Sequence, residues 1–229
     1  MNIRKKDKRI HKLKAKWFQT QLTHWFKLNC RKFPWRKKSA SKYQLIIAEV
    51  LLQRTKAETV SGFYPKFIKK FTSWKVLAKA KKKDLQIFLK PIGLWRQRAS
   101  AIKNLSAEMA KRNGRFPKTR EEIEKVPAVG QYIANAVLMF CHGQPQPLLD
   151  VNMARVLERF FGPRKLADIR YDPYLQKLAM DVLPKKKSRD FNWAILDFAS
   201  KVCKPQKPLC KNCCLANKCL FYKKHACFL

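Results

Sequence analysis

Acidic residues are scarce in this sequence of 229 residues. Asp and Glu together number 15, against 52 Lys and Arg, so the formal net charge is +37. Such an excess favours a polyanionic partner, because each phosphate that a cation neutralises releases a counterion. Runs such as Lys81–Lys83 and Lys185–Lys187 are individually typical of a solvated surface, and a lysine-rich genome composition explains part of the excess. Nucleic acid is nevertheless the leading partner.

The sequence also lacks long apolar runs. None is long enough for a membrane span, which takes about 20 apolar residues. The basic segment Arg4–Arg9 is followed by Leu13, Trp17 and Phe18 with charges between them, rather than by the apolar core of a secretory signal. We therefore expect a protein without membrane contact, in the cytoplasm or nucleoid, or in the nucleus if the organism is a eukaryote. In a reducing compartment its eight cysteines do not form a disulfide framework.

Alternation of apolar and polar residues, the signature of strands, is missing too, and apolar residues recur at helical spacing. Gly and Pro residues separate the helical stretches, and no internal repeat interrupts them. The predicted helices span Leu13–Phe26, Tyr43–Leu52, Thr59–Phe71, Lys83–Leu89, Arg96–Arg112, Glu121–Val126, Gln131–Cys141, Asn152–Phe161, Pro173–Val182 and Ser188–Cys203. The sequence therefore predicts an all-α protein of roughly ten short helices.

Four cysteines lie close together near the end of the chain, in the pattern Cys203-x6-Cys210-x2-Cys213-x5-Cys219. Thiolates at this density in a reducing compartment are typical metal ligands. Spacing alone leaves a four-cysteine zinc site and a cubane iron-sulfur cluster as close competitors. Cys214 is an alternative ligand because it adjoins Cys213.

A tight turn from Pro127 to Gly130 separates a helix that ends at Lys125 from one that begins at Gln131. This pattern predicts a helix-hairpin-helix, whose outward N–H groups bind a DNA phosphate without reading bases. Taken alone, such a turn is more typical of an ordinary link between helices. The isolated carboxylate of Asp150 strengthens the prediction: a lone Asp at a helix start is usually an N-cap, but here the same group is also placed to face a sugar.

These motifs resemble the helix-hairpin-helix DNA glycosylases of the endonuclease III superfamily. The similarity includes Val126–Gly130, Leu148–Asn152, Phe33–Arg36, Ala48–Thr55 and the cysteine pattern, and covers nearly the whole chain. The resemblance implies two helical domains. A six-helix domain of residues 41–146 carries the hairpin at 121–141, and a second domain of residues 1–40 and 147–229 holds a 4Fe-4S cluster in the loop 203–219. The zinc alternative loses ground accordingly.

The position of Tyr132 separates the branches of the superfamily. Bifunctional members have a lysine there, whose amine attacks the sugar and leads to strand cleavage, so a tyrosine implies a monofunctional enzyme. Asp150 then stabilises an oxocarbenium-like centre or activates water. A tyrosine is typical of archaeal-type mismatch thymine glycosylases, whereas MutY-type adenine glycosylases have a small serine.

The segment Gly93–Ala99 agrees with the thymine assignment, since it is one residue shorter than in MutY-type enzymes. We therefore expect excision of thymine and uracil from G·T and G·U mismatches. Glu49 is shared with adenine glycosylases, where it protonates the purine, so adenine excision from A·G or A·8-oxoguanine stays an alternative. A non-catalytic protein that binds damaged DNA is another, although retention of Asp150 and Glu49 argues against it.

The target base must leave the stack before its glycosidic carbon is accessible. By family position Gln53 fills the vacated space and Leu94 wedges into the opposite strand. For Trp95, burial in the core is an equally favoured alternative to contact with DNA. For Gln131, a solvent-facing position is the alternative to a phosphate contact. The expected DNA-binding residues are Gln53, Arg54, Leu94, Trp95, Arg96, Val129, Gly130, Gln131 and Asn152. Ala128 replaces the glycine usual in this hairpin, which shifts the N–H there. The expected partner is double-stranded DNA with a mismatch, bound by a monomer.

Overall fold

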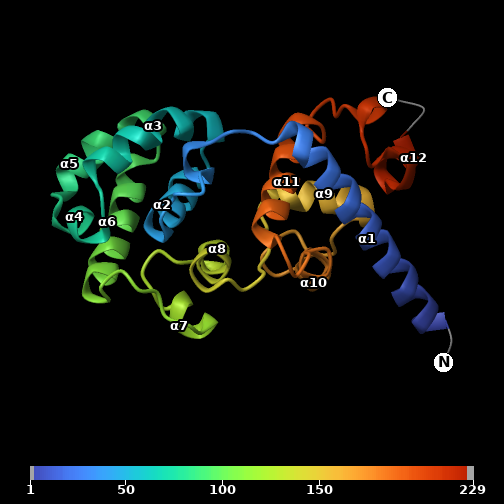
Figure 1. Ribbon diagram of the computed structural model, residues 1–229, viewed down its shortest axis with the longest axis horizontal. Helices are drawn as coiled ribbons and strands as arrows, with labels where there is room; N and C mark the ends of the chain where they lie inside the picture. Colours follow the sequence, from blue (N-terminus) through green and yellow to red (C-terminus); the bar gives the residue numbers. More distant parts are fainter. Residues whose placement is uncertain (1–2, 226–229) are drawn as a thin grey trace. The chain divides into compact units, whose positions relative to one another are not determined.

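The computed structural model describes residues 3–225, with side chains from residue 12 onward. Every regular element in that part of the chain is helical (Figure 1). The elements are α1 (Ile3–Asn29), η1 (Pro34–Arg36), α2 (Lys42–Leu52), α3 (Ala57–Lys70), α4 (Trp74–Lys79), α5 (Lys82–Leu89), η2 (Lys90–Ile92), α6 (Trp95–Lys111), α7 (Arg120–Glu124), α8 (Gln131–His142), α9 (Val151–Phe161), α10 (Pro173–Asp181), α11 (Ser188–Lys201), η3 (Cys210–Asn212), η4 (Ala216–Lys218) and α12 (Leu220–His225). The all-α prediction is confirmed. Among the described helices, none combines the length and the apolarity that crossing a membrane requires.

The chain divides into two compact units. The terminal unit consists of Met1–Arg31 and Pro145–Leu229, and the central unit is Lys32–Gln144. From the sequence, the boundaries were predicted between residues 40 and 41 and between residues 146 and 147. The first boundary lies earlier because Trp35 in η1 packs edge-on against Tyr64 of α3, at 5.5 Å between ring centroids, which holds this segment in the central unit.

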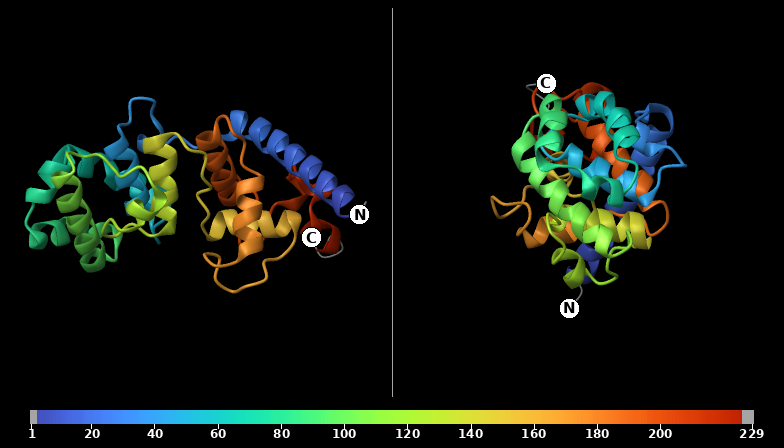
Figure 2. Two further views of the ribbon diagram at one scale, coloured as in Figure 1. Left: turned by 90° about the horizontal axis from the view of Figure 1, so that it is seen from below. Right: turned by 90° about the vertical axis from the view of Figure 1, so that its left-hand side faces the viewer.

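Two apolar helices, α2 and α8, pack against each other in the central unit. Ser41 begins α2 with a capping box, in which its side chain accepts from the Gln44 N–H and the Gln44 side chain accepts from the Ser41 N–H. Residues 45–51 of α2 are all buried, and α2 packs against α8. Phe63, Phe67, Phe71 and Phe88 form an aromatic cluster beside them. Figure 2 shows α2 in blue and α8 in yellow. The core fixes α2 and α8, which carry two of the expected catalytic residues.

Both ends of the chain contribute to the core of the terminal unit. Phe18 of α1 contacts Phe160, Phe161 and Phe191, with ring centroids 4.9 to 6.2 Å apart. At the end of α1, Arg31 Nε donates to Oδ1 of the fully buried Asp197 at 2.7 Å, and the Arg31 N–H donates to Oδ2 at 2.9 Å. These contacts join α1 to α9 and α11.

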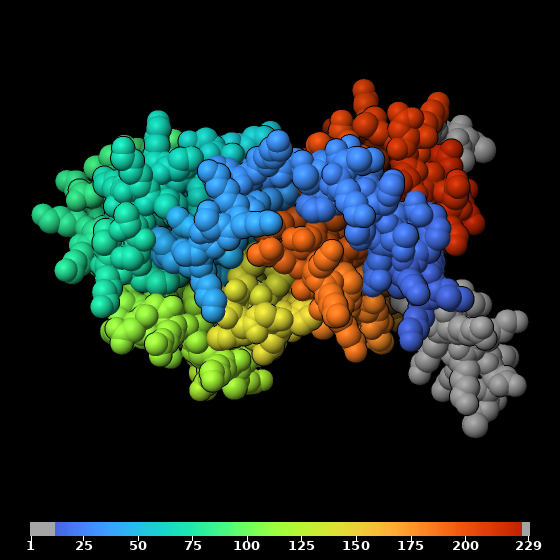
Figure 3. Space-filling model, in the orientation of Figure 1, coloured from blue at the N-terminus to red at the C-terminus, as the bar shows by residue number. Residues whose placement is uncertain are grey.

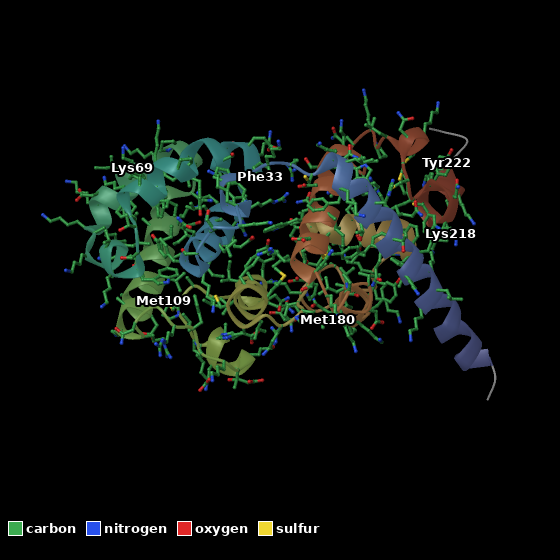
Figure 4. All side chains as sticks on the ribbon, in the orientation of Figure 1. Phe33, Lys69, Met109, Met180, Lys218 and Tyr222 are labelled. Atoms are coloured by element: carbon green, nitrogen blue, oxygen red, sulfur yellow. The ribbon has the colours of Figure 1, made fainter. Side chains whose placement is uncertain are left out.

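The cysteine segment lies beside α1 in the same unit. Its red surface borders the blue surface of α1 in Figure 3. Lys218, labelled in Figure 4, places its Nζ 4.8 Å from the ring centroid of Trp17 in α1. Cys203, Cys213 and Cys219 pack against the apolar core of the unit. The expected ligand loop is therefore anchored to the body of the unit rather than extending from it.

Candidate active site

The hairpin between α7 and α8 is tight and supported by its own backbone. The Val126 N–H donates to the Ile123 carbonyl at 3.0 Å, and the Val129 N–H donates to the Val126 carbonyl at 3.1 Å. Both valines are buried, so they anchor the turn in the central unit. Ala128 has a φ of 63°, a left-handed conformation that a glycine adopts without strain. An alanine in place of the glycine that is usual in this hairpin is therefore locally strained.

Gly130 is the N-cap of α8, and no side chain caps this helix. Its φ of −88° is open to any residue, and a Cβ placed on it meets no atom within 4 Å. Neither backbone conformation nor packing within the described residues requires a glycine here. The open space and the first-turn N–H groups at the positive end of a helix suit an anion that approaches the backbone closely.

Tyr132 and Glu49 form a hydrogen-bonded pair. The Tyr132 hydroxyl in the first turn of α8 donates to Glu49 Oε2 in α2 at 2.8 Å. Glu49 is 3% exposed, and its neighbours on α2 are apolar. A buried carboxylate needs such donors, because desolvation penalises its charge. The structure thus joins two expected catalytic residues that lie 83 positions apart in the sequence.

The expected wedge residues lie on two turns of the central unit. Gln53 and Arg54 follow α2, and Leu94 immediately precedes α6. All three are exposed, and Arg54 and Leu94 have positive φ values of 56° and 49°. An exposed leucine in a left-handed turn has little to contribute to folding, which makes it a candidate for contact with a ligand.

Trp95 is half-buried rather than a core residue. The guanidinium carbon of Arg96 lies 4.0 Å from the ring centroid of Trp95, within range of a cation–π contact. Arg96 itself is exposed. This stacked pair presents a positive charge beside Leu94.

Asp150 caps α9 in the terminal unit. Its Oδ1 accepts from the N–H groups of Asn152 and Met153 at 2.9 and 2.8 Å, and its Oδ2 accepts from Asn152 Nδ2 at 2.7 Å. Burial raises the pKa of Asp150 above its usual range, and the hydrogen bonds from Met153 and Asn152 oppose that rise, as does the charge of Arg155. The cap thus holds a carboxylate in a fixed orientation in a poorly solvated place.

The orientation of Asn152 is itself fixed by Arg155. Both terminal nitrogens of Arg155 donate to Asn152 Oδ1 at 3.2 Å, and Arg155 Nε donates to the Cys203 carbonyl at 2.9 Å. A continuous chain of hydrogen bonds therefore runs from the carboxylate of Asp150 to the first cysteine of the tail pattern. Arg155 was not singled out from the sequence.

Four cysteines of the tail pattern line a single cavity, together with apolar residues of α9 and α11. The four are Cys203, Cys210, Cys213 and Cys219. Cys214 is not among the residues that line this cavity. Soft sulfur donors of this kind suit zinc or an iron-sulfur cluster. In the part of the chain that the structure describes, no three His, Cys, Asp or Glu residues are grouped closely enough to share one metal ion.

The surroundings of the cysteines are apolar and cationic. Burial raises the pKa of the Cys213 thiol to about 12, so near neutral pH this thiol stays protonated unless a nearby positive charge stabilises the thiolate. Arg159 Nη1 lies 3.4 Å from Cys203 Sγ and donates to the Lys204 carbonyl at 2.7 Å. A set of four thiolates would be strongly negative, and Arg159 is placed to offset part of that charge.

The expected site residues divide between the two units. The central unit holds Glu49, Gln53, Arg54, Leu94, Trp95, Arg96, Val129, Gly130, Gln131 and Tyr132, and the terminal unit holds Asp150, Asn152 and the cysteines. One residue that the sequence analysis missed is Arg98, which is 6% exposed. Its burial, though not its contacts, had a signal in the sequence, because Arg98 falls on the apolar stripe of α6 at the spacing of Ile102, Leu105 and Met109.

Comparisons with known proteins agree with these features. Residues 47–179 match the HhH-GPD superfamily of base excision DNA repair proteins. The chain is 35% identical over 213 residues to a thymine/uracil-DNA glycosylase of Pyrobaculum aerophilum, which covers 90% of this chain and 92% of the relative. It is 34% identical to a thymine-DNA glycosylase of Aeropyrum pernix, covering 88% and 92% respectively. The solved structure of a thermostable thymine-DNA glycosylase is similar with a TM-score of 0.84 and 33% identity, covering 92% of this chain and 97% of that one.

Proposed function

Because the chain belongs to the HhH-GPD superfamily of base excision DNA repair proteins, as its motifs predicted, we propose that it is a DNA glycosylase that excises thymine and uracil from G·T and G·U mismatches. The observation that carries the base assignment is the bond from Tyr132 to Glu49. The names of the Pyrobaculum and Aeropyrum relatives support it.

The same bond supports the proposal that the enzyme is monofunctional. A lyase of this superfamily needs an amine where Tyr132 stands, and a phenol cannot form a Schiff base with the sugar. The phenol instead donates a hydrogen bond to Glu49 Oε2. This oxygen is engaged by Tyr132 and is not free to hand a proton to a departing base. This arrangement suits a pyrimidine, whose departure through N1 requires less protonation than that of a purine.

Asp150 is the residue that we assign to the glycosidic bond. Positive charge develops on the sugar as the bond breaks, and a fixed carboxylate stabilises that charge without reorganising. Three donated hydrogen bonds keep Asp150 oriented and favour its ionised form against the effect of burial. Water then completes the reaction at the sugar, with Asp150 as its base.

The hairpin supplies a contact that does not depend on DNA sequence. A phosphate at the first turn of α8 receives backbone N–H groups, and Gly130 leaves it room to approach. Gln131 and Val129 flank this position, and Asn152 lies in the first turn of α9. The net charge of +37 adds an attraction that falls with salt. We expect one molecule to act on one mismatch.

Two observations support the proposal that the four cysteines hold a 4Fe-4S cluster: the four soft donors line one cavity with apolar walls, and an arginine lies at its edge. A cluster bound there supplies iron–thiolate bonds that fix the loop. The loop's own residues Lys207, Lys211 and Lys218 are exposed, so a fixed loop presents their ammonium groups to DNA phosphates.

Excision assays on four duplexes test the function directly. Purified protein is incubated with duplexes carrying G·T, G·U, A·G and A·8-oxoguanine pairs, and the products are separated before and after alkali. We expect strand breaks only after alkali and only with G·T and G·U. Excision confined to the adenine mismatches would refute the base assignment, breaks without alkali would refute monofunctionality, and binding without excision of any base would indicate a DNA-damage-binding protein.

A further inference from the structure

Two turns of the central unit are held together by one buried side chain. The first turn contains Gln53 and Arg54 after α2, and the second contains Gly93 and Leu94 before α6. The guanidinium of Arg98, from the first turn of α6, lies between them. We call these two segments the Gln53 turn and the Leu94 turn.

Arg98 donates to both turns at once. Its Nη2 donates to the Gln53 carbonyl and to Thr55 Oγ1, each at 2.8 Å. Its Nη1 donates to the Ile92 carbonyl at 3.0 Å and also to the Gly93 carbonyl. A fifth bond closes the bridge directly, because Thr55 Oγ1 donates to the Ile92 carbonyl at 3.3 Å. Each nitrogen therefore serves a different turn.

The acceptors make this arrangement unusual for a buried cation. Arg98 is 6% exposed and lies on the apolar face of α6, where desolvation lowers its pKa. Its acceptors are three carbonyls and one hydroxyl, all of them neutral, so attraction to a carboxylate does not explain its burial. An apolar side chain would fill this place without the cost of desolvating a charge. The planar fork of an arginine does what an apolar group cannot, since it fixes several acceptors in one plane.

Each of the two turns contains a residue in an unfavourable backbone conformation. Arg54 and Leu94 are both in the left-handed region, with φ of 56° and 49°, which is unfavourable for residues with a Cβ. Both are exposed, so packing does not restrain their side chains. Each turn has a backbone bond of its own, from the Thr55 N–H to the Leu52 carbonyl and from the Arg98 N–H to the Leu94 carbonyl. The side-chain bonds of Arg98 and Thr55 add to these and join one turn to the other.

We propose that Arg98 is a positioning residue that fixes the spacing of the Gln53 turn and the Leu94 turn, so that the two turns enter the DNA duplex as one rigid element. The inference rests on the proposed function, in which Gln53 fills the space of the extruded base and Leu94 wedges into the opposite strand. If the turns moved independently, each insertion would have to be ordered separately, and the extruded state would lose stability. Arg98 therefore acts on base extrusion and not on cleavage of the glycosidic bond.

The test compares a thymine that must be extruded with one that is already unstacked. The variants are Arg98→Met, Arg98→Lys and Thr55→Val. The control is Arg112→Met, which removes an exposed arginine from the cap at the far end of the same helix, where it pairs with Glu108. Single-turnover rates are measured on a G·T duplex and on the same strand with thymine in an unpaired bubble, and melting temperatures are recorded for every variant.

We expect Arg98→Met to slow excision from the G·T duplex by about 10- to 100-fold, because the variant loses several charge-assisted hydrogen bonds. Excision from the bubble should slow by less than about 3-fold. Arg98→Lys and Thr55→Val should show the same selective loss to a smaller degree, and Arg112→Met should match the wild type. A merely structural role would slow both substrates together. Equal slowing on both substrates, or an unchanged rate on the duplex, would overturn the proposal.

Extrusion can also be followed without excision. A 2-aminopurine beside the mismatch brightens when its neighbour leaves the stack, and the amplitude in stopped-flow mixing should fall in Arg98→Lys and Thr55→Val. Both changes are mild, so the measurement does not depend on whether Arg98→Met folds. A wild-type protein that brightens the probe but excises no base would refute the proposed function while leaving this inference in force. Equal amplitudes in the wild type and both variants would refute the inference alone.

Discussion

Replacing Asp150 with asparagine separates its role as a helix cap from its proposed role in catalysis. Asparagine keeps a carbonyl oxygen at the position of Oδ1, which accepts from the N–H groups of Asn152 and Met153. At the position of Oδ2 it places an NH₂ group opposite Asn152 Nδ2, which is also a donor. Asn152 cannot turn its amide without cost, because its oxygen accepts from Arg155. The substitution therefore loses one hydrogen bond to a charged acceptor.

The change in stability should be small. Loss of such a bond costs roughly 1.5–3 kcal/mol, and removal of a buried charge offsets part of it. Burial raises the pKa of Asp150, so at neutral pH the buried charge destabilises the folded state. Asp150→Asn removes this destabilisation, and the gain in stability shrinks as pH falls toward 3.8, where the wild-type carboxyl is protonated as well. We expect a net change within about 2 kcal/mol, or a shift in melting temperature below about 8 °C.

The loss of activity should be far larger. Removing a preorganised charge that faces the transition state costs about 10²–10³-fold or more in rate. Single-turnover excision from a G·T duplex measures this loss, and fluorescence anisotropy on the same duplex should show nearly unchanged binding. In the wild type the rate should fall with acid through a pKa above 3.8, since only the anion is active. Excision within about 10-fold of the wild type would show that Asp150 is only a cap, as would a large loss of both binding and stability.

Three further predictions follow from single features. Tyr132→Lys places an amine where lyases of the superfamily have one, so borohydride should trap a covalent complex with DNA; the wild type is the control, and trapping there would contradict the monofunctional assignment. Ala128→Gly removes a left-handed alanine, which should stabilise the protein by about 0.5–1 kcal/mol in thermal unfolding; a lower melting temperature would show that the turn is not strained. Purified protein should be brown, with absorbance near ~400 nm that Cys213→Ser abolishes and Cys30→Ser preserves, whereas a colourless protein with stoichiometric zinc would refute the cluster.

The long apolar helices could be predicted from the sequence to within a residue or two. Expected spans of Tyr43–Leu52 and Gln131–Cys141 correspond to α2 (Lys42–Leu52) and α8 (Gln131–His142), because each combines an apolar run with a capping residue or a glycine stop. Two short helices were missed. With six residues each, α4 and α12 have too few turns to show a period. Helix α1 begins at Ile3, ten residues before the predicted start at Leu13. The start was predicted too late because the first turns of the helix are basic and show no apolar stripe.

The sequence singles out candidate site residues one at a time, but it does not reveal the contacts between them. Glu49 and Tyr132 were each expected, while the bond between them depends on how α2 packs against α8. Arg98 and Arg155 were missed because their acceptors are mainly backbone carbonyls, which every residue has and which no sequence pattern identifies. The roles of the individual residues in DNA binding and catalysis stay predictions until the variants above are measured.

The division of the chain has a consequence for its synthesis on the ribosome. The central unit is one continuous segment, Lys32–Gln144, which can fold as it emerges. Phe18 finds its partners Phe160, Phe161 and Phe191 only after that segment has been made. Helix α1 therefore waits through most of translation with its apolar face uncovered, until α9 and α11 arrive. Asp150 follows Gly130 in the sequence, so a nascent chain carries the hairpin before it carries the carboxylate that we assign to cleavage.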